Sequence, residues 1–272
     1  MVAVKDEERP KVEWRLGEAS EALMQMIGFE PTGEDQARIL RCRKRFKQVV
    51  GGGQAGKSME ASADFIIHLF EDRVKHPMES LLYWLVAADY GRTRREFEYL
   101  TRNFAELGVL DEGHTSTRVD PGQIVLKTGM RIETKSTKDV ATIAMYAPDG
   151  IIACEASQLE LEAYYRLWSR AKAGNGWFFM SGTFESSLGW YPKLYEAWIY
   201  GTKQAQSFSL PSWTNKYLYP GGRNDPKIKS MEEEFPDEFF QERVAGRPCP
   251  PKGLVFHEFR PDLHIREDVE WL

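Results

Sequence analysis

Apolar residues along this chain form two kinds of pattern, short continuous or alternating runs and longer stretches with helical spacing. The strand-like runs occupy residues 46–50, 81–88, 123–136, 150–154 and 177–181, and residues 123–136 turn at Thr128-Gly129 as a hairpin. Helical spacing is present at residues 18–27, 34–43, 92–107, 159–172, 191–200 and 231–244, and in the stretch that begins at Ser58. Continuous apolar strands that alternate with helices predict an α/β fold, with a mainly parallel central sheet and helices on both faces.

The composition is that of a globular protein and narrows the possible functions. Of the 272 residues, 42% are hydrophobic and 28% are charged, which is enough to build a core and excludes general disorder. The net charge of -5 argues against a small basic protein that coats nucleic acid, but it leaves open a DNA enzyme with a local basic channel. The basic run at residues 41–47 is either a DNA contact or a solvated helix end.

Cysteine spacing and the N-terminal residues indicate the compartment. Cys42, Cys154 and Cys249 are far apart and offer no CxxC zinc pair, which predicts a reducing, intracellular setting. The N-terminal residues are too charged for a signal peptide. No apolar run approaches the roughly 20 residues of a membrane span.

A glycine-rich segment between the first predicted strand and the following helix fits the phosphate-binding pattern GxxxxGK[ST]. Its residues are Gly51, Gly52, Gly53, Gln54, Ala55, Gly56, Lys57 and Ser58. Glycines let consecutive backbone N–H groups turn toward phosphate oxygens, and the helix presents its positive end to the same anion. Lys57 would bridge the β- and γ-phosphates and the Ser58 hydroxyl would bind Mg²⁺, so the segment predicts an ATP site with Mg²⁺.

ATPases of this type need a second strand that ends in acidic residues, one beside Mg²⁺ and the next beside the attacking water. The best match is residues 149–156, where an apolar strand ends at Glu155. Glu155 is the predicted water-activating residue, and capping of the following helix is its alternative role. Cys154 stands where the Mg²⁺-associated Asp is expected, and a thiol is a poor partner for this hard cation. Asp149 and Glu185 are the acidic neighbours considered as replacements.

Further segments extend these motifs into a longer pattern. They are Gly28-Phe29-Glu30-Pro31 with Gln36, residues 84–90, residues 178–183 followed by Gly189-Trp190-Tyr191, and residues 253–259 with 262–264. Together with the phosphate-binding segment, they resemble the ATPase portion of the large terminase subunit of tailed bacteriophages over residues 25–265. The resemblance assigns Gln36 to adenine recognition, Ser181, Gly182 and Thr183 to a coupling motif, and residues 253–264 to the junction before a nuclease domain.

The resemblance implies ATP hydrolysis that powers translocation of viral double-stranded DNA into a procapsid. It implies the portal protein and the small terminase subunit as partners, a homo-oligomeric ring on the portal, and a location in the cytoplasm of the infected host cell, transiently on the procapsid. We expect a flexible N-terminal arm at residues 1–17, a P-loop ATPase domain at residues 18–245, and a linker toward an absent nuclease domain at residues 246–272. Nuclease activity is not expected in this chain.

The chain departs from the family pattern at its cationic positions. Gly53 stands where many members carry Arg, and residues 142–148 lack the Arg that many members use across a subunit boundary. The arginine finger is therefore unassigned, with Lys138, Arg131, Arg118 and Arg170 as candidates. A helicase-like or repair ATPase is one alternative function. A non-catalytic nucleotide-dependent scaffold is another, and Cys154 is the best argument for it.

Overall fold

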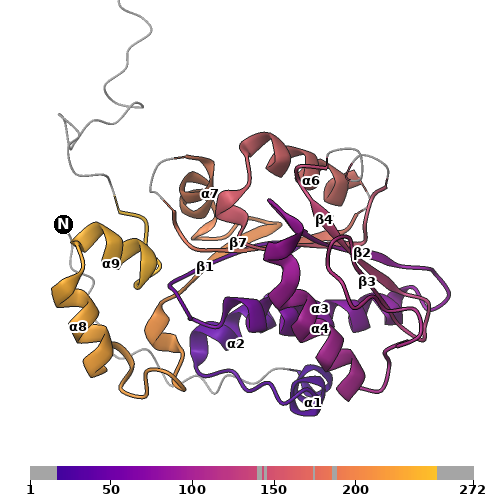
Figure 1. The fold of residues 1–272 in the computed structure, drawn as a ribbon, viewed down its shortest axis with the longest axis horizontal. Coiled ribbons are helices and arrows are strands. Elements are labelled where there is room, and N and C mark those ends of the chain that lie inside the picture. Colours follow the sequence, from indigo (N-terminus) through magenta and orange to yellow (C-terminus); the bar gives the residue numbers. More distant parts are fainter. Residues whose placement is uncertain (1–16, 140–142, 144–145, 174, 186–188, 250–272) are drawn as a thin grey trace, which may run out of the picture.

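A central β-sheet organises the chain (Figure 1), and the computed structural model describes residues 17–139, 143, 146–173, 175–185 and 189–249. Within these residues the sheet has seven strands in the order β3-β4-β2-β5-β6-β1-β7. Their bounds are β1 Phe46–Gly51, β2 Leu82–Ala87, β3 Gln123–Val125, β4 Arg131–Ser136, β5 Gly150–Ala153, β6 Trp177–Gly182 and β7 Ala205–Leu210. Every neighbouring pair is parallel except the β3–β4 hairpin. The predicted mainly parallel sheet is thereby confirmed.

Helices cover both faces of the sheet (Figure 1). One face is covered by α1 Glu18–Met26, α2 Glu34–Arg41, α3 Lys57–Lys75 and α4 Arg94–Glu106, and the other by α6 Leu161–Ala173 and α7 Trp190–Trp198. Two short helices, α8 Pro226–Glu234 and α9 Asp237–Arg243, lie at the β1 and β7 end of the molecule. Because β1, β2, β5 and β6 are parallel, their carboxyl ends share one edge, which is where open α/β sheets bind ligands.

Two elements differ from the sequence prediction. The strand β7 was not predicted, because polar residues interrupt its apolar run; Ser207 donates to Gln48 Oε1 at 2.9 Å and Ser209 to the carbonyl of Gly246 at 2.9 Å. The helix predicted at residues 231–244 is in fact two helices. Phe235 is extended, with φ -90° and ψ 149°, because the ring of the following Pro236 disfavours a helical backbone at that position.

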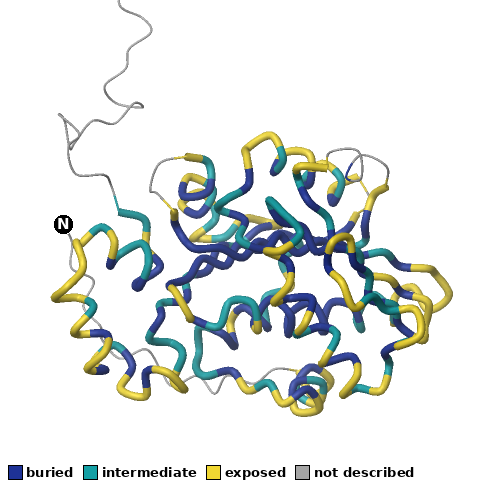
Figure 2. Tube along the Cα trace, in the orientation of Figure 1, coloured by how far each residue is buried: buried dark blue, intermediate teal, exposed yellow. Residues whose placement is uncertain are grey.

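Apolar side chains form a separate core on each face of the sheet, and Figure 2 shows the strands as the most continuously buried part of the chain. Phe65, Ile66 and Leu69 of α3 pack under one face. Tyr164 and Leu167 of α6 pack on the other face. A small third core joins α8 and α9 through Ile228, Phe240 and Val244. With both faces covered, the exposed carboxyl edge of the sheet is free to carry the site.

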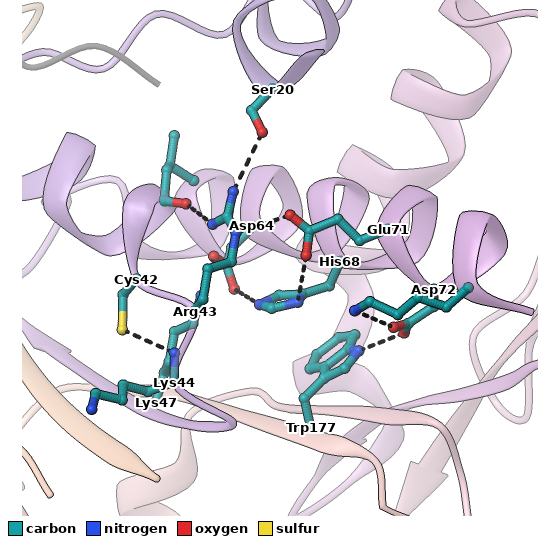
Figure 3. A network of polar contacts seen from close by, with 12 residues as sticks. Ser20, Cys42, Arg43, Lys44, Lys47, Asp64, His68, Glu71, Asp72 and Trp177 are labelled. Atoms are coloured by element: carbon teal, nitrogen blue, oxygen red, sulfur yellow. Dashed lines mark hydrogen bonds and ion pairs between the residues drawn. The ribbon is translucent and has the colours of Figure 1, made fainter. Parts of the chain in front are cut away.

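A buried ion pair joins β1 to α3 (Figure 3). Lys47 Nζ lies 2.5 Å from Asp64 Oδ1, and both side chains are at most 2% exposed. His68 Nε2 lies 3.7 Å from the other oxygen of Asp64, and burial, with the nearby Lys47 charge, holds the pKa of His68 well below its usual range. Removing one partner would leave an unpaired buried charge, so the pair holds α3 in place against β1.

The basic run at residues 41–47 also makes internal contacts. Arg43 Nε lies 2.9 Å from Glu71 Oε1, as Figure 3 shows. Arg45 donates to the carbonyls of Gly176 at 2.6 Å and Ala171 at 2.7 Å. Together with the buried Lys47, these contacts connect the start of β1 to α3 and to the end of α6. These cations contribute to packing, and Arg43, just after the end of α2, is also exposed to solvent.

Glu60 is an unusual buried acid close to the start of α3. The residue is fully buried, and within the described part of the chain neither carboxylate oxygen has a hydrogen-bond partner. Burial, reinforced by the nearby Asp64, raises the pKa of Glu60 well above its usual range. Burial thus favours the protonated form of Glu60, because a buried and unpaired carboxylate is costly.

Several expectations fall on residues outside the described ranges. These are most of the N-terminal arm, the junction segment at residues 253–264, and the predicted linker from residue 250 onward. The division of the chain at residues 17 and 245 therefore stays a prediction.

Candidate nucleotide-binding site

The phosphate-binding segment connects β1 to α3 at the carboxyl edge of the sheet. Gly56, which precedes α3, and Gln54 have left-handed backbones, with φ of 92° and 59°. At Gly52 an added Cβ would lie 2.3 Å from Ser212 Oγ and 2.4 Å from the carbonyl oxygen of Val244. At Gly53 the nearest atom to an added Cβ is 3.8 Å away. Close packing thus requires glycine at position 52, and position 53 has room for a side chain.

Residues from the C-terminal third of the chain hold the P-loop from outside. Ser212 Oγ donates to the carbonyl of Gly53 at 2.7 Å, and Asn215 Nδ2 donates to the carbonyl of Gln54 at 2.8 Å. The N–H of Gly53 donates to the carbonyl of Arg243 at 2.7 Å. Sequence reasoning missed these contacts, because residues 211–226 are rich in turn-forming residues and carry no motif.

A cleft of about 380 Å³ opens beside the P-loop. Its lining residues are Gly53, Gln54, Ala55, Gly56, Lys57, Ser58, Met59, Arg95, Tyr99, Glu155, Thr183, Asn215 and Leu218. The cleft brings together the predicted phosphate-binding residues, the predicted water-activating residue and one residue of the predicted coupling motif. Arg95 of α4 adds a cation to the lining, and the sequence motifs did not mark Tyr99, Asn215 and Leu218, which come from α4 and from the segment after β7.

Lys57 lies at the start of α3 with its ammonium group turned back onto the loop. Its Nζ donates to the carbonyls of Gly52 at 2.9 Å and Gly51 at 3.2 Å. Burial lowers the pKa of Lys57, and the negative charges of Glu155 and Glu96 oppose this shift. The helix start and the ammonium group together give this end of the cleft a positive potential, which suits a phosphate ligand.

Glu155 lies two residues after the end of β5 and lines the cleft. Its backbone is left-handed, with φ 48° and ψ 48°, which is uncommon for a residue other than glycine. Glu155 precedes a short 3₁₀ helix at Ala156–Gln158, but in the described structure its side chain makes no capping hydrogen bond to that helix. The alternative capping role is therefore wrong. The turn instead directs the carboxylate toward the cleft.

A second carboxylate lies near Ser58, on an element that the sequence did not single out. Glu96, in the first turn of α4, is 3% exposed and lies close to the side chains of Ser58 and Cys154. Burial raises the pKa of Glu96, and the polar side chains of Ser58 and Cys154 oppose the shift. Burial also raises the pKa of the Cys154 thiol well above its usual range, with the nearby Glu96 charge acting in the same direction. The Cys154 thiol is therefore neutral.

The acidic residues considered as replacements for the charge missing at Cys154 lie elsewhere. Asp149 Oδ2 accepts from the N–H of Leu82 at 2.8 Å, at the amino end of β2 and β5. Glu185 lies 2.7 Å from Arg243 and accepts from Gln158 Nε2 at 3.2 Å. Asp149 is at the wrong edge of the sheet, and Glu185 is occupied by Arg243, so neither replaces the missing charge.

Gln36 is buried beside the P-loop. Its Oε1 accepts a hydrogen bond of 2.7 Å from the N–H of Thr32, and its Nε2 lies 3.2 Å from where a Cβ of Gly56 would stand. A small cavity of about 170 Å³ adjoins it, lined by Thr32, Gly33, Glu34, Asp35, Gln36, Trp213, Thr214 and Lys216. The predicted adenine-recognition residue is therefore next to the phosphate-binding segment, although residues 28–36 and 51–58 are separate in sequence.

The three residues of the predicted coupling motif occupy different positions. Ser181 and Gly182 are buried within β6, in register with Val49 and Val50 of β1, and Thr183 lines the cleft. A Cβ at Gly182 would lie 2.9 Å from the hydroxyl oxygen of Tyr191 in α7. Thr183 can therefore contact a ligand directly, and Ser181 and Gly182 cannot.

The arginine-finger candidates divide between the two edges of the sheet. Arg131 is in register with Leu82 at the amino end of β2, and Arg170 is near the end of α6, where Ala171 contacts Arg45. Lys138 and Arg118 are exposed near the carboxyl end of β4. As far as the structure describes the chain, none of the four lines the cleft. Among the described residues, Lys57 and Arg95 are the only cations in its lining.

The donor atoms beside the P-loop suit Mg²⁺ bound together with a nucleotide. Among the described residues there is no group of three or more His, Cys, Asp or Glu side chains that could hold a metal ion. Mg²⁺ with a nucleotide needs no such group, because it keeps several waters and uses phosphate oxygens and one or two protein ligands. The hydroxyl of Ser58, with the buried carboxylate of Glu96 behind it, fits that requirement.

No described helix is both long enough and apolar enough to cross a membrane.

The fold is that of phage large terminase ATPase domains, as the sequence resemblance predicted. No protein-family model and no curated protein sequence matches the chain. The large terminase ATPase domain of Thermus phage P74-26 is similar with a TM-score of 0.65 at 15% identity, covering 83% of this chain and 97% of that one. The large terminase of bacteriophage D6E in complex with ADP has a TM-score of 0.62 at 15% identity, covering 88% and 59%. The bacteriophage HK97 large terminase has a TM-score of 0.57 at 11% identity, covering 86% and 51%.

Proposed function

We propose that this chain is a DNA-packaging ATPase, which hydrolyses ATP at the P-loop to drive viral double-stranded DNA into a procapsid. The observation that carries the proposal is the cleft in which Lys57, Ser58 and Glu155 converge. It is supported by the fold shared with the D6E large terminase, of which solved structures contain ADP and ATP-γ-S.

Binding of ATP would use the backbone of residues 51–58 for the phosphates and Gln36 for the base. The amide of Gln36 lies beside Gly56 and has hydrogen-bonding capacity beyond its contact with Thr32. Mg²⁺, when bound with the nucleotide, would be held by Ser58 and would neutralise negative charge on the phosphates. Lys57 would exchange its contacts with the carbonyls of Gly51 and Gly52 for phosphate oxygens.

Hydrolysis would begin with a water held by Glu155 in line with the γ-phosphate. The carboxylate accepts a proton from this water as it attacks phosphorus, and the bond to the ADP oxygen breaks. Lys57 stabilises the charge that develops on the transferred group. Arg95 is a further cation on the wall of the cleft and adds to this stabilisation from within the same subunit.

Coupling of hydrolysis to movement would start at Thr183, which directly follows β6 and lines the cleft. Because Gly182 closely approaches Tyr191, a shift of this strand end acts on α7. Glu185, two residues after Thr183, is bonded to Arg243 of α9. These contacts would transmit a change at the γ-phosphate to two helices outside the cleft, α7 and α9.

The assembly that this function requires is a homo-oligomeric ring on the portal protein, with DNA delivered by the small terminase subunit. It would operate in the cytoplasm of the infected host cell, on the procapsid. A neighbouring subunit would supply an arginine to each cleft. Lys138 and Arg118, which are exposed at the carboxyl edge of the sheet, are better placed for this role than Arg131 and Arg170.

The deciding experiment measures phosphate release by the chain with and without double-stranded DNA and portal protein, and DNA uptake by procapsids. ATP turnover stimulated by both partners, together with protected DNA, is the expected result. ATP binding without turnover under all conditions would favour a nucleotide-dependent scaffold. Turnover stimulated by DNA and coupled to strand separation would favour a helicase-like ATPase.

A further inference from the structure

A series of four hydrogen bonds connects the turn that carries Glu155 to the P-loop. The N–H of Gln158 donates to the carbonyl of Glu155 at 3.0 Å, and Gln158 Nε2 donates to Glu185 Oε1 at 3.2 Å. Arg243 Nη2 donates to Glu185 Oε2 at 2.7 Å, and the N–H of Gly53 donates to the carbonyl of Arg243, also at 2.7 Å. Glu155 and Gly53 both line the cleft, so the series links two parts of the candidate site.

The carboxylate of Glu185 is the middle of this series. Its two oxygens accept from two separate segments, Oε1 from the 3₁₀ helix that follows Glu155 and Oε2 from α9. An ionised carboxylate has only acceptor oxygens and can receive both donors, whereas an amide presents N–H groups on one side. The series therefore requires an acid at position 185.

Stability alone gives little reason for the contact between Glu185 and Arg243. The two side chains are 37% and 32% exposed, and ion pairs this open to solvent contribute little to the free energy of unfolding. The backbone of Glu155, in contrast, is left-handed, and such a backbone persists only where surrounding contacts hold it. Gln158 closes the turn after Glu155, and Glu185 holds Gln158 from outside the turn.

We propose that Glu185 is a positioning residue for hydrolysis, which holds Glu155 at the distance from the P-loop that attack on the γ-phosphate requires. This inference rests on the proposed ATPase function. Glu185 is absent from the described lining of the cleft, so it acts through Glu155 and not on the nucleotide. A misplacement of about 1 Å can slow a reaction by about 10²-fold, so a contact that adds little stability can still control the rate.

The test measures single-turnover ATP hydrolysis, with the chain in excess of ATP, and the dissociation constant of ATP-γ-S. Glu185→Gln presents an N–H to one of the two donors and should slow hydrolysis about tenfold. The dissociation constant should change by less than about twofold, and the melting temperature should stay close to that of the wild type. Glu232 is the matched control, because its side chain is also 37% exposed and pairs with two cations, Arg223 and Lys229. Glu232→Gln should hydrolyse ATP as the wild type does.

Two double variants separate positioning from a general structural effect. When Glu155→Gln is already present, Glu185→Gln should cause no further loss, because a residue that acts through Glu155 then has no base to position. Adding Gln158→Glu to Glu185→Gln exchanges the two groups. The amide at position 185 can then donate to the carboxylate at position 158 and accept from Arg243, so most of the rate should return.

Several results would overturn the assignment of Glu185. They are a wild-type rate in Glu185→Gln, a loss that lies in nucleotide binding, a further loss when Glu155→Gln is present, or a folded exchange variant that does not recover. A wild-type chain that binds ATP-γ-S and hydrolyses no ATP would instead contradict the proposed function, and the assignment would fail with it.

Discussion

The hydroxyl of Ser212 donates a hydrogen bond of 2.7 Å to the carbonyl of Gly53, across 159 residues of sequence. Asn215 makes the corresponding contact with Gln54. The shape of the phosphate-binding loop therefore depends on a segment that follows the last strand of the sheet. The contacts with this segment therefore limit which substitutions the loop tolerates, in addition to any limit set by phosphate binding.

Substitutions at Gly52 and Gly53 should have opposite outcomes. A methyl group at Gly52 would meet Ser212 and the backbone of Val244 at 2.3 and 2.4 Å, so Gly52→Ala should destabilise the fold by about 1–3 kcal/mol and weaken ATP binding. Gly53→Ala meets no atom closer than 3.8 Å and should be nearly neutral. Thermal melting and nucleotide titration of the pair check this. Equal effects would show that the loop has another conformation in solution.

Lys57→Ala should abolish ATP turnover and leave the fold intact. The ammonium group contacts only loop carbonyls of Gly51 and Gly52 among the described residues, so little of the packing depends on it. A phosphate-release assay measures the loss, and circular dichroism with a melting curve measures the fold. Turnover within a few-fold of wild type would remove Lys57 from the mechanism.

Glu155→Gln should bind ATP normally and hydrolyse it at least about 10²-fold more slowly, because the amide cannot accept the proton of the attacking water. Single-turnover hydrolysis separates this chemical step from binding and product release. The exposed Glu160→Gln nearby is the control and should retain wild-type rates. Near-normal hydrolysis in Glu155→Gln would assign the base to a different residue.

Arg95→Ala should weaken ATP binding about fivefold, equivalent to about 1 kcal/mol, and ADP binding by less. The residue lines the cleft and lies close enough to Lys57 to lower the pKa of that lysine, so both cations lie in the same cleft. The neighbouring Arg94 is not in the lining of the cleft as described, and Arg94→Ala should have no effect. Calorimetric titration with ATP and ADP measures the difference, and equal losses for both arginines would contradict it.

The buried Glu60 should make the protein less stable as the pH rises. Its pKa in the folded chain is raised far above 4.5 by burial, so above about pH 4.5 the unfolded chain releases a proton that the folded chain keeps. The free energy of unfolding then falls by up to about 1.4 kcal/mol per pH unit until the folded pKa is reached. Glu60→Met should raise the melting temperature more at about pH 8 than at about pH 5. Glu98→Met, at an exposed site, should show no such pH dependence.

The strands nearest the site could be predicted from the sequence, because β1, β2, β5 and β6 are covered on both faces and consist of continuous apolar residues. The P-loop and Glu155 could be predicted because each lies at the carboxyl end of such a strand. The strand β7 could not be predicted, because Ser207 and Ser209 interrupt its apolar pattern and have their hydrogen-bond partners in segments distant in sequence. Glu96 could not be predicted either, because a buried acid and an exposed acid in a helix have the same local sequence pattern. The residues that hold the loop, Ser212 and Asn215, carry no local signal for the same reason.

Arg243 of α9 joins the P-loop to Glu185, which follows β6. Its backbone carbonyl accepts the N–H of Gly53 and its guanidinium group binds Glu185, each at 2.7 Å. Both hydrogen bonds of Arg243 can form together only when the P-loop and the residues after β6 are at the right distance from each other. Movement of the two segments apart would stretch or break one of these bonds. The position of α9 therefore depends on the width of the cleft, and a change in that width would displace α9.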